Sequence, residues 1–277
     1  MDLTRVAEET LEILAQGRYV APSGRTVPLD LSACVGGTRT WRPDELQALL
    51  EGATVEGAPV EAPITAPPGA ARLEVTDETT AAAARRLAGE GPVLLLNFAS
   101  AVSVGGGFLR GARAQEEDLC RCSALYACLQ PQRAYYQANR AAGSDLYTDH
   151  MIVSPAVPFF RDDRLALLEV PFAATVLTAP APCARQLDLQ REAARLRGVF
   201  ERRVGMLLAL ARALGHRRLV LGAWGCGAFR NDPTLVADVF ARELAGAAGL
   251  EQVVFAVHDR TPERPTLQAF QARLASG

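Results

Sequence analysis

Up to residue 70 the pattern of hydrophobic and polar positions predicts only a few short elements. Apolar residues spaced by about one turn within residues 4–16 indicate an amphipathic helix. Residues 17–31 indicate a short hairpin that turns at Ser23-Gly24, and Pro43 is typical of the first turn of a second helix, ending near Gly52. The prolines of residues 57–70 exclude regular structure, so this stretch is expected to be a loop.

From residue 71 onward, apolar strand-sized runs alternate with longer amphipathic stretches. The runs predict strands at residues 71–75, 93–98, 151–155, 172–180, 217–222 and 252–257. The amphipathic stretches predict helices at residues 77–88 (with Asp77 as N-cap), 115–129, 187–214 and 233–244, and a short closing helix after Pro265. This alternation is typical of an α/β sandwich around a mixed, largely parallel sheet.

Two of the predicted strands run directly into glycine clusters. One junction spans Asn97–Gly107 and the other Leu221–Phe229. Ligands of open α/β sheets bind beyond the carboxyl ends of the strands, and glycine lets backbone amides approach a pyrophosphate closely. Three glycines alone could equally be a plain turn. The chain has no P-loop lysine motif and no GxGxxG followed by a helix.

The first glycine cluster is followed by two adjacent carboxylates, Glu116 and Glu117. Acidic residues at the start of a helix can simply interact with the helix dipole. Neighbouring helix residues also point about 100° apart, so one carboxylate can hold hydroxyl groups while the other faces a scissile bond. A carboxyl group desolvated beside another has a raised pKa, as a general acid requires. The sequence therefore predicts a site for proton transfer next to a site for an anion.

Composition narrows the function classes. The 277 residues carry a net charge of −2, so no global basic field attracts nucleic acid or a membrane, and no apolar run has the roughly 20 residues of a membrane span. The acidic, amphipathic N-terminus does not resemble a secretory signal. Six cysteines without paired CxxC spacing and only three histidines argue against a metal site. Cys120, Cys122 and Cys128 are expected to be buried free thiols on one helix, which fits a reducing cytoplasm.

Taken together, these motifs resemble a known family. Three glycines, seven residues and then QEE, with LNFAS before them and SPAVPFFRDD and GAWGCGAFRNDP after them, are similar to the poly(ADP-ribose) glycohydrolases of compact bacterial type. That family has the macrodomain fold. The resemblance is strongest over residues 90–260. It implies a three-layer α/β/α catalytic core at residues 91–277, with residues 1–90 as an N-terminal extension packed on it as one structural unit.

The resemblance also implies roles for individual residues. Glu117 would be the catalytic acid and base, and Glu116 would hold hydroxyls of the ribose that is released. Substrate-binding positions carried over from the family are Asn97 (ribose), Gln115 (loop support), Gly105, Gly106, Gly107, Gly225, Cys226, Gly227 and Ala228 (diphosphate), Phe229 (ribose beside the scissile bond) and Phe255 (adenine). One departure is the AVSV stretch before the glycines, where an asparagine-proline is expected.

The implied activity is hydrolysis of ribose–ribose O-glycosidic bonds in poly(ADP-ribose), which releases ADP-ribose. Such a bond breaks through an oxocarbenium-like transition state that needs one carboxylic acid and no metal or cofactor. The expected partners are the polymer and ADP-ribosylated proteins, with no direct contact to nucleic acid or membrane. The expected setting is a cytoplasmic monomer in the DNA damage response. A mono-ADP-ribosyl-protein hydrolase and a non-catalytic ADP-ribose-binding module remain as alternatives.

The closing segment predicts where the polymer is cut. Leu267, Phe270 and Leu274 form one apolar face of the last helix. We expect this face to cover the adenosine end of the site, which would block the 2′ oxygen through which the polymer continues, so that ADP-ribose is released mainly from chain ends. If the helix packed on the back of the sandwich instead, the site would be open.

Overall fold

The structure is a computed structural model that describes residues 2–57 and 71–274. The expected loop at residues 57–70 lies almost wholly outside the described residues. The elements follow one another in this order: α1 (Leu3–Gln16), β1 (Arg18–Val20), β2 (Thr26–Pro28), α2 (Ser32–Gly37), β3 (Arg39–Trp41), α3 (Pro43–Leu50), β4 (Arg72–Thr76), α4 (Thr80–Ala88), β5 (Val93–Phe98), η1 (Phe108–Arg110), α5 (Gln115–Cys122), α6 (Leu125–Leu129), α7 (Arg133–Ala141), β6 (Met151–Arg161), β7 (Leu167–Ala179), η2 (Ala184–Gln186), α8 (Leu189–Ala213), β8 (Arg218–Leu221), α9 (Pro233–Ala245), β9 (Gln252–Ala256) and α10 (Pro265–Leu274).

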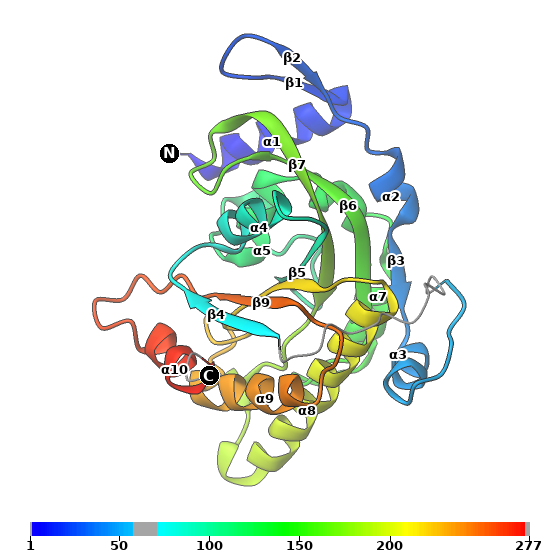
Figure 1. Cartoon of the computed structure of the whole chain (residues 1–277), viewed down its shortest axis with the longest axis vertical. Helices are drawn as coiled ribbons and strands as arrows, with labels where there is room; N and C mark the ends of the chain where they lie inside the picture. The colour runs from blue at the N-terminus through cyan, green and yellow to red at the C-terminus, as the bar shows by residue number, and fades with distance from the viewer. Residues whose placement is uncertain (1, 58–70, 275–277) are drawn as a thin grey trace.

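A seven-stranded mixed sheet divides the molecule into layers. Its strand order is β3-β6-β7-β5-β8-β9-β4 (Figure 1). The five strands from β7 to β4 run parallel, while β6 pairs antiparallel with both β7 and β3. The parallel strands therefore place their carboxyl ends at one edge of the sheet, where ligands bind in such folds. This agrees with the three-layer α/β/α sandwich that the sequence predicts.

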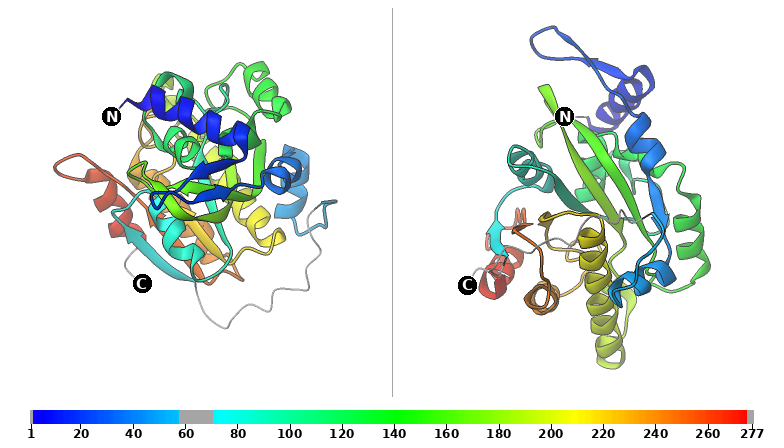
Figure 2. Two further views of the ribbon diagram at one scale, coloured as in Figure 1. Left: turned by 90° about the horizontal axis from the view of Figure 1, so that it is seen from above. Right: turned by 45° about the vertical axis from the view of Figure 1, so that its right-hand side comes forward.

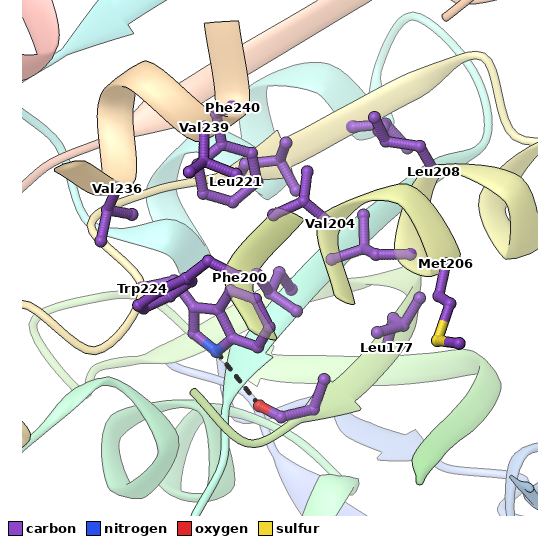
Figure 3. Packing of buried hydrophobic residues seen from close by; sticks show 14 of the residues in the cluster. Leu177, Phe200, Val204, Met206, Leu208, Leu221, Trp224, Val236, Val239 and Phe240 are labelled. Atoms are coloured by element: carbon purple, nitrogen blue, oxygen red, sulfur yellow. Dashed lines mark hydrogen bonds between the residues drawn. The ribbon is translucent and has the colours of Figure 1, made fainter. Parts of the chain in front are cut away.

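Each face of the sheet has its own hydrophobic core. One face packs against α3, α8, α9 and α10, and the other against α4, α5, α6 and α7 (Figures 1 and 2). Figure 3 shows the first core, in which the Trp224 ring meets Phe200 edge-on at 5.7 Å. The Trp224 Nε1 donates to the carbonyl of Ala179 at 3.2 Å, so the buried indole is also satisfied as a donor.

The N-terminal region is not separate from the sheet. Strands β3 and β4, which both precede residue 90, are its two edge strands. Helix α1 packs on α5, where Thr10 Oγ1 donates to the carbonyl of Arg121 at 3.2 Å. Residues before position 90 thus contribute two strands to the same sheet as the residues after it, while the boundary itself stays a prediction.

Helix predictions were correct in place but not always in length. The expected helix over residues 115–129 is two helices, because Ser123 is extended (φ −147°, ψ 179°) and forms a bridge with Phe159 of β6. The cysteines 120, 122 and 128 are buried and free, as expected, but lie on α5 and α6. Helix α4 starts at residue 80 with Thr79 as its N-cap, and not with Asp77. In the described part of the chain no helix has both the length and the hydropathy of a membrane span.

Two expectations about the end of the chain are wrong. The apolar face of α10 packs on α9 and β4 in the first core, so this face does not cover the carboxyl edge of the sheet. Phe255 is completely buried between Phe240 and Phe270, with ring centroids at 5.2 and 5.7 Å. Its side chain belongs to the core and is not available to stack on adenine.

The burial of Phe255 yields a test of this core. Phe255→Ala should lower the free energy of unfolding by about 3–5 kcal/mol, the usual cost of truncating a buried aromatic ring. Urea denaturation followed by circular dichroism measures this loss. Val170→Ala, at a side chain that is 69% exposed, is the control and should change stability by less than about 0.5 kcal/mol. A loss for Phe255→Ala as small as the control's would contradict the packing described here.

Candidate active site

A cavity of about 670 Å³ opens at the carboxyl edge of the parallel strands. Its walls come from the ends of β5, β8 and β9, from the start of α4 and from the start of α5. Its lining includes Phe98 and Gln115, the segment Gly225–Phe229, and residues 256–261 with Thr266. The cavity thus unites both strand-to-glycine junctions that the sequence singled out.

Glu116 is buried beside the end of β5. The residue is 3% exposed, and its carboxyl group accepts from the backbone amide of Ser100 at 2.7 Å and from Asn97 Nδ2 at 3.2 Å. The pKa of Glu116 is raised to about 8, mainly by burial. The two hydrogen bonds lower this pKa by a smaller amount, and the charge of the neighbouring Glu117 raises it. Glu116 is therefore mostly protonated at neutral pH, and can both donate to and accept from a hydroxyl group.

Glu117 lies against the first glycine loop. Its Oε1 accepts from the amide of Gly107 at 2.8 Å, and its side chain is 8% exposed. A Cβ at Gly106 would lie 2.4 Å from Glu117 Oε1 and 3.1 Å from Glu116 Oε2, and Gly106 has φ +59°. Only glycine fits there, because a side chain would displace the carboxylates and the backbone is left-handed. The two glutamates and the glycine loop are one unit.

Two amides of the first glycine loop are already bound within the protein. The amide of Gly106 donates to the carbonyl of Ser103 at 3.0 Å, and the amide of Gly107 is bound to Glu117. Of the described residues that line the cavity, none belongs to 105–107. Among the described residues nothing accepts from the amide of Gly105, and the contact of Gly105–Gly107 with a diphosphate stays a prediction.

Gln115 and Asn97 fix the start of α5 to the sheet. Gln115 Oε1 accepts from the amide of Phe98 at 2.8 Å, and its Nε2 donates to the carbonyl of Leu96 at 2.7 Å and to Thr80 Oγ1 at 3.1 Å. Asn97 also donates to Thr178 Oγ1 at 3.2 Å, while its buried Oδ1 has no partner among the described residues. Gln115 thus lies where a supporting residue is expected, and Asn97 retains an unused acceptor beside Glu116.

The second glycine loop presents unused donors. Gly225 has φ +78°, and a Cβ there would lie 2.6 Å from the Cβ of Ala181. Among the described residues, nothing accepts from the amides of Gly227, Ala228 or Phe229, and a Cβ at Gly227 would meet open space. Consecutive free amides of this kind form a concave site for an anion. Cys226 is half-buried in the same loop, and burial raises the pKa of its thiol to about 12, so it is a neutral thiol.

Phe229 is one of the aromatic residues that line the cavity. Its ring is half-buried and packs against Tyr147, with centroids 5.9 Å apart. Asn231, which the sequence analysis missed, holds the loop from behind, because its Nδ2 donates to the carbonyls of Gly225 at 3.0 Å and Pro182 at 2.8 Å. The position of Asn231 just before the Asp232-Pro233 helix start is a local signal that could have indicated it.

With this geometry in place, the chain can be compared with known proteins. A family model described as the catalytic domain of microbial-type PARG, or poly(ADP-ribose) glycohydrolase, matches residues 7–162. The chain belongs to this family. No curated protein sequence matches it significantly.

Solved structures of the family are similar over nearly the whole chain. The poly(ADP-ribose) glycohydrolase of Thermomonospora curvata is 46% identical, with 98% of this chain and 99% of that chain covered and a TM-score of 0.90. The same protein bound to the inhibitor ADP-HPD has a TM-score of 0.89. The glycohydrolase of Deinococcus radiodurans in complex with ADP-ribose is 44% identical, with 90% and 99% coverage and a TM-score of 0.81.

In this member of the microbial glycohydrolase family, the raised pKa of Glu116 makes stability depend on pH. Burial raises the pKa from an ordinary 4.5 to about 8, so the folded state binds the proton more tightly than the unfolded state. The resulting stabilisation is complete below about pH 4.5 and is lost as the pH rises through about 8. Glu116→Gln removes this titration.

As the pH rises from about 5 to 8, the parent should therefore lose stability relative to Glu116→Gln, as measured by the free energy of unfolding. The change should reach several kcal/mol, at about 1.4 kcal/mol per pKa unit. Urea denaturation across this pH range measures it, and any pH-independent cost of the amide cancels from the trend. Parallel curves for the two proteins would show that Glu116 does not titrate there.

Proposed function

We propose that this protein hydrolyses ribose–ribose O-glycosidic bonds in poly(ADP-ribose) and releases ADP-ribose. The observation that carries the proposal is the pair of buried carboxyl groups held against Gly106, beside a cavity lined by the free amides of Gly227–Phe229. Family membership and the similarity to glycohydrolases bound to ADP-ribose and ADP-HPD support the same activity.

The arrangement suggests how the reaction proceeds. Glu117 protonates the 2′ oxygen of the adjacent adenosine ribose as its bond to C1″ breaks, which leaves an oxocarbenium-like ribose. The carboxylate then removes a proton from the water that attacks C1″, so Glu117 ends the cycle protonated again. Glu116, protonated at neutral pH, and the free Oδ1 of Asn97 hold hydroxyls of the reacting ribose. The amides of Gly227–Phe229 bind the diphosphate, and Phe229 packs on the ribose beside the bond.

The two alternative functions differ in how well the site fits them. A module that only binds ADP-ribose would not need a second buried carboxyl group against the loop, since each buried carboxyl group costs free energy. A hydrolase for single ADP-ribose groups on proteins would share the cavity. Incubation with purified polymer and, separately, with mono-ADP-ribosylated protein, followed by chromatography of free ADP-ribose, distinguishes all three. Release from the polymer alone supports the proposal.

We propose that the protein acts in the cytoplasm as a monomer. Its substrate would be the polymer that is attached to proteins during the DNA damage response. Six free cysteines, five of them buried, support a reducing compartment. A net charge of −2 gives no reason for direct binding to nucleic acid.

Glu117→Gln tests the catalytic assignment. The amide keeps the shape of the side chain but supplies no proton, so turnover of polymer should fall by about 10²–10⁴-fold while ADP-ribose affinity stays within a few-fold. Glu90→Gln is the matched control, because Glu90 is exposed in the turn before β5, at the opposite edge of the sheet. Turnover by Glu117→Gln close to that of the parent would assign the acid to another group, first of all Glu116.

We also propose that ADP-ribose is released mainly from the ends of the polymer. The reason is the segment before α10, and not the apolar face of that helix. The apolar face of α10 packs in the core, but residues 258–261, which precede the helix, and Thr266 in its first turn line the same cavity as Phe229. Adenosine bound against this segment would have its 2′ oxygen covered, so the polymer could not continue from it.

The products of early digestion test this preference. Long polymer should yield ADP-ribose from the first minutes, with the remaining chains shortening gradually and few oligomers of intermediate size. Gel electrophoresis of the chains alongside chromatography of ADP-ribose follows both. Abundant oligomers before ADP-ribose accumulates would contradict release from the ends, although not hydrolysis itself.

A further inference from the structure

Tyr147 stands in an unusual backbone conformation close to the cavity. Its φ is +55°, in the left-handed region that a bulky side chain rarely adopts. The residue lies in the loop between α7 and β6, and its ring packs on Phe229 at a centroid distance of 5.9 Å and an interplanar angle of 44°. Because asparagine or glycine would adopt this conformation more readily, the presence of a ring calls for an explanation.

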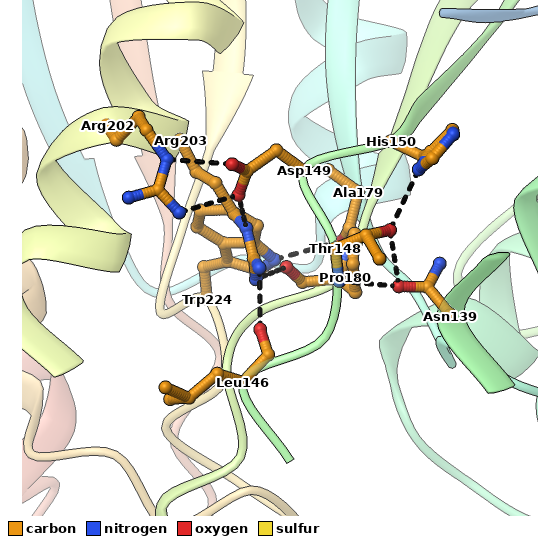
Figure 4. A network of polar contacts seen from close by, with 10 residues as sticks. All are labelled: Asn139, Leu146, Thr148, Asp149, His150, Ala179, Pro180, Arg202, Arg203 and Trp224. Atoms are coloured by element: carbon orange, nitrogen blue, oxygen red, sulfur yellow. Dashed lines mark hydrogen bonds and ion pairs between the residues drawn. The ribbon is translucent and has the colours of Figure 1, made fainter. Parts of the chain in front are cut away.

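The loop is held on both sides of Tyr147 (Figure 4). On one side the carbonyl of Leu146 accepts from Arg203 Nη2. On the other side the amide and the hydroxyl of Thr148 both donate to Asn139 Oδ1 at 2.8 Å. A strained conformation persists only where the surroundings determine it in this way, and such positions cluster at functional sites.

Arg203 is a costly anchor for a surface loop. Its side chain is 0% exposed, and it projects from α8 to bind Asp149 Oδ1 at 2.7 Å and the carbonyl of Pro180 at 2.9 Å (Figure 4). Asp149 also binds Arg202. A buried guanidinium is stable only when its N–H donors are hydrogen-bonded. The carbonyls of Leu146 and Pro180 accept from Arg203, and these hydrogen bonds fix the two loops in place.

The anchored segments lead directly to Phe229. The amide of Cys183 donates to the carbonyl of Asp145 at 2.8 Å, which joins the two loops that Arg203 holds. The amide of Ala184 in turn donates to the carbonyl of Phe229 at 3.0 Å. Phe229 is thus held through its backbone by one segment and through its ring by Tyr147 of the other.

We propose that Tyr147 is a positioning residue, which sets the orientation of the Phe229 ring against the ribose at the scissile bond. The inference rests on the glycohydrolase activity proposed above. Tyr147 acts through the ring contact, while Arg203 and Asn139 hold its backbone where that contact is made. Loss of the ring frees Phe229 to tilt, so the bond to be cut is misplaced although ADP-ribose still binds.

The experiment compares turnover with binding. Tyr147→Ala should lower kcat for polymer by between about 10- and 100-fold, and the Kd for ADP-ribose, measured by calorimetry, should change by less than about 3-fold. Tyr147→Phe, which keeps the ring, should recover most of the lost turnover. Tyr147→Gly relieves the positive φ, so it should lose turnover like Tyr147→Ala despite equal or higher thermal stability.

A double-mutant cycle identifies the route of the effect. If Tyr147 acts through Phe229, then Tyr147→Ala combined with Phe229→Ala should turn over polymer no more than about 3-fold more slowly than Phe229→Ala alone. Tyr19→Ala is the control, since Tyr19 and Phe160 form a similar pair (6.0 Å, 37°) that packs outside the cavity. It should lower the melting temperature without separating kcat from Kd.

Two results would overturn the inference. Fully additive losses in the cycle, or a loss by Tyr147→Ala that only follows its folded fraction, would reduce Tyr147 to ordinary packing while leaving the proposed function intact. No ADP-ribose release by the parent protein would instead overturn the proposed function and this inference together.

Discussion

The burial of two adjacent carboxyl groups is the constraint on which the rest of the site depends. Removing a carboxylate from water is costly unless it is protonated or hydrogen-bonded. Glu116 is mostly protonated at neutral pH, since its pKa is about 8, and its carboxyl group also accepts two hydrogen bonds. Glu117 accepts a backbone amide from a loop that can approach only because Gly106 lacks a side chain. The glycines and the glutamates therefore depend on each other, because the carboxyl groups can be buried only where the glycine backbone approaches them.

This arrangement needs a rigid support, which the sheet and the extension both supply. Both polar atoms of the Gln115 side chain form hydrogen bonds, to the backbone at the end of β5 and to Thr80. These bonds fix the position of α5 along the strand. Helix α1 covers α5 from outside, and a Cβ at Gly111, just after the glycine loop, would lie 2.9 Å from Thr4 Oγ1. Part of the N-terminal region therefore belongs to the support of the site.

The sequence predicted what is local and missed what depends on tertiary packing. The apolar strands and the glutamate pair have clear patterns, and the structure contains them. In a strand buried on both faces, however, such as β9, the pattern does not tell which face a ring occupies, and Phe255 turned out to lie in the core. The break at Ser123 results from pairing with Phe159, 36 positions later in the chain. Likewise, Tyr147 has no local signal, because a buried arginine on α8 determines its conformation.

The two loops at the carboxyl edge of the sheet are prepared for a ligand in opposite ways. Around the glutamates nearly every donor is already used, which fixes the geometry before any ligand arrives and leaves Asn97 Oδ1 as a spare acceptor. Around the second loop the amides of Gly227–Phe229 are unused, while the turn itself is held by Asn231 and Trp224. Unpaired amides gain most from an anion, because a charged acceptor forms stronger hydrogen bonds than a neutral one. Binding affinity is thus expected to come mainly from the loop after β8, and catalysis from the loop after β5, so that the two can be altered separately by substitution.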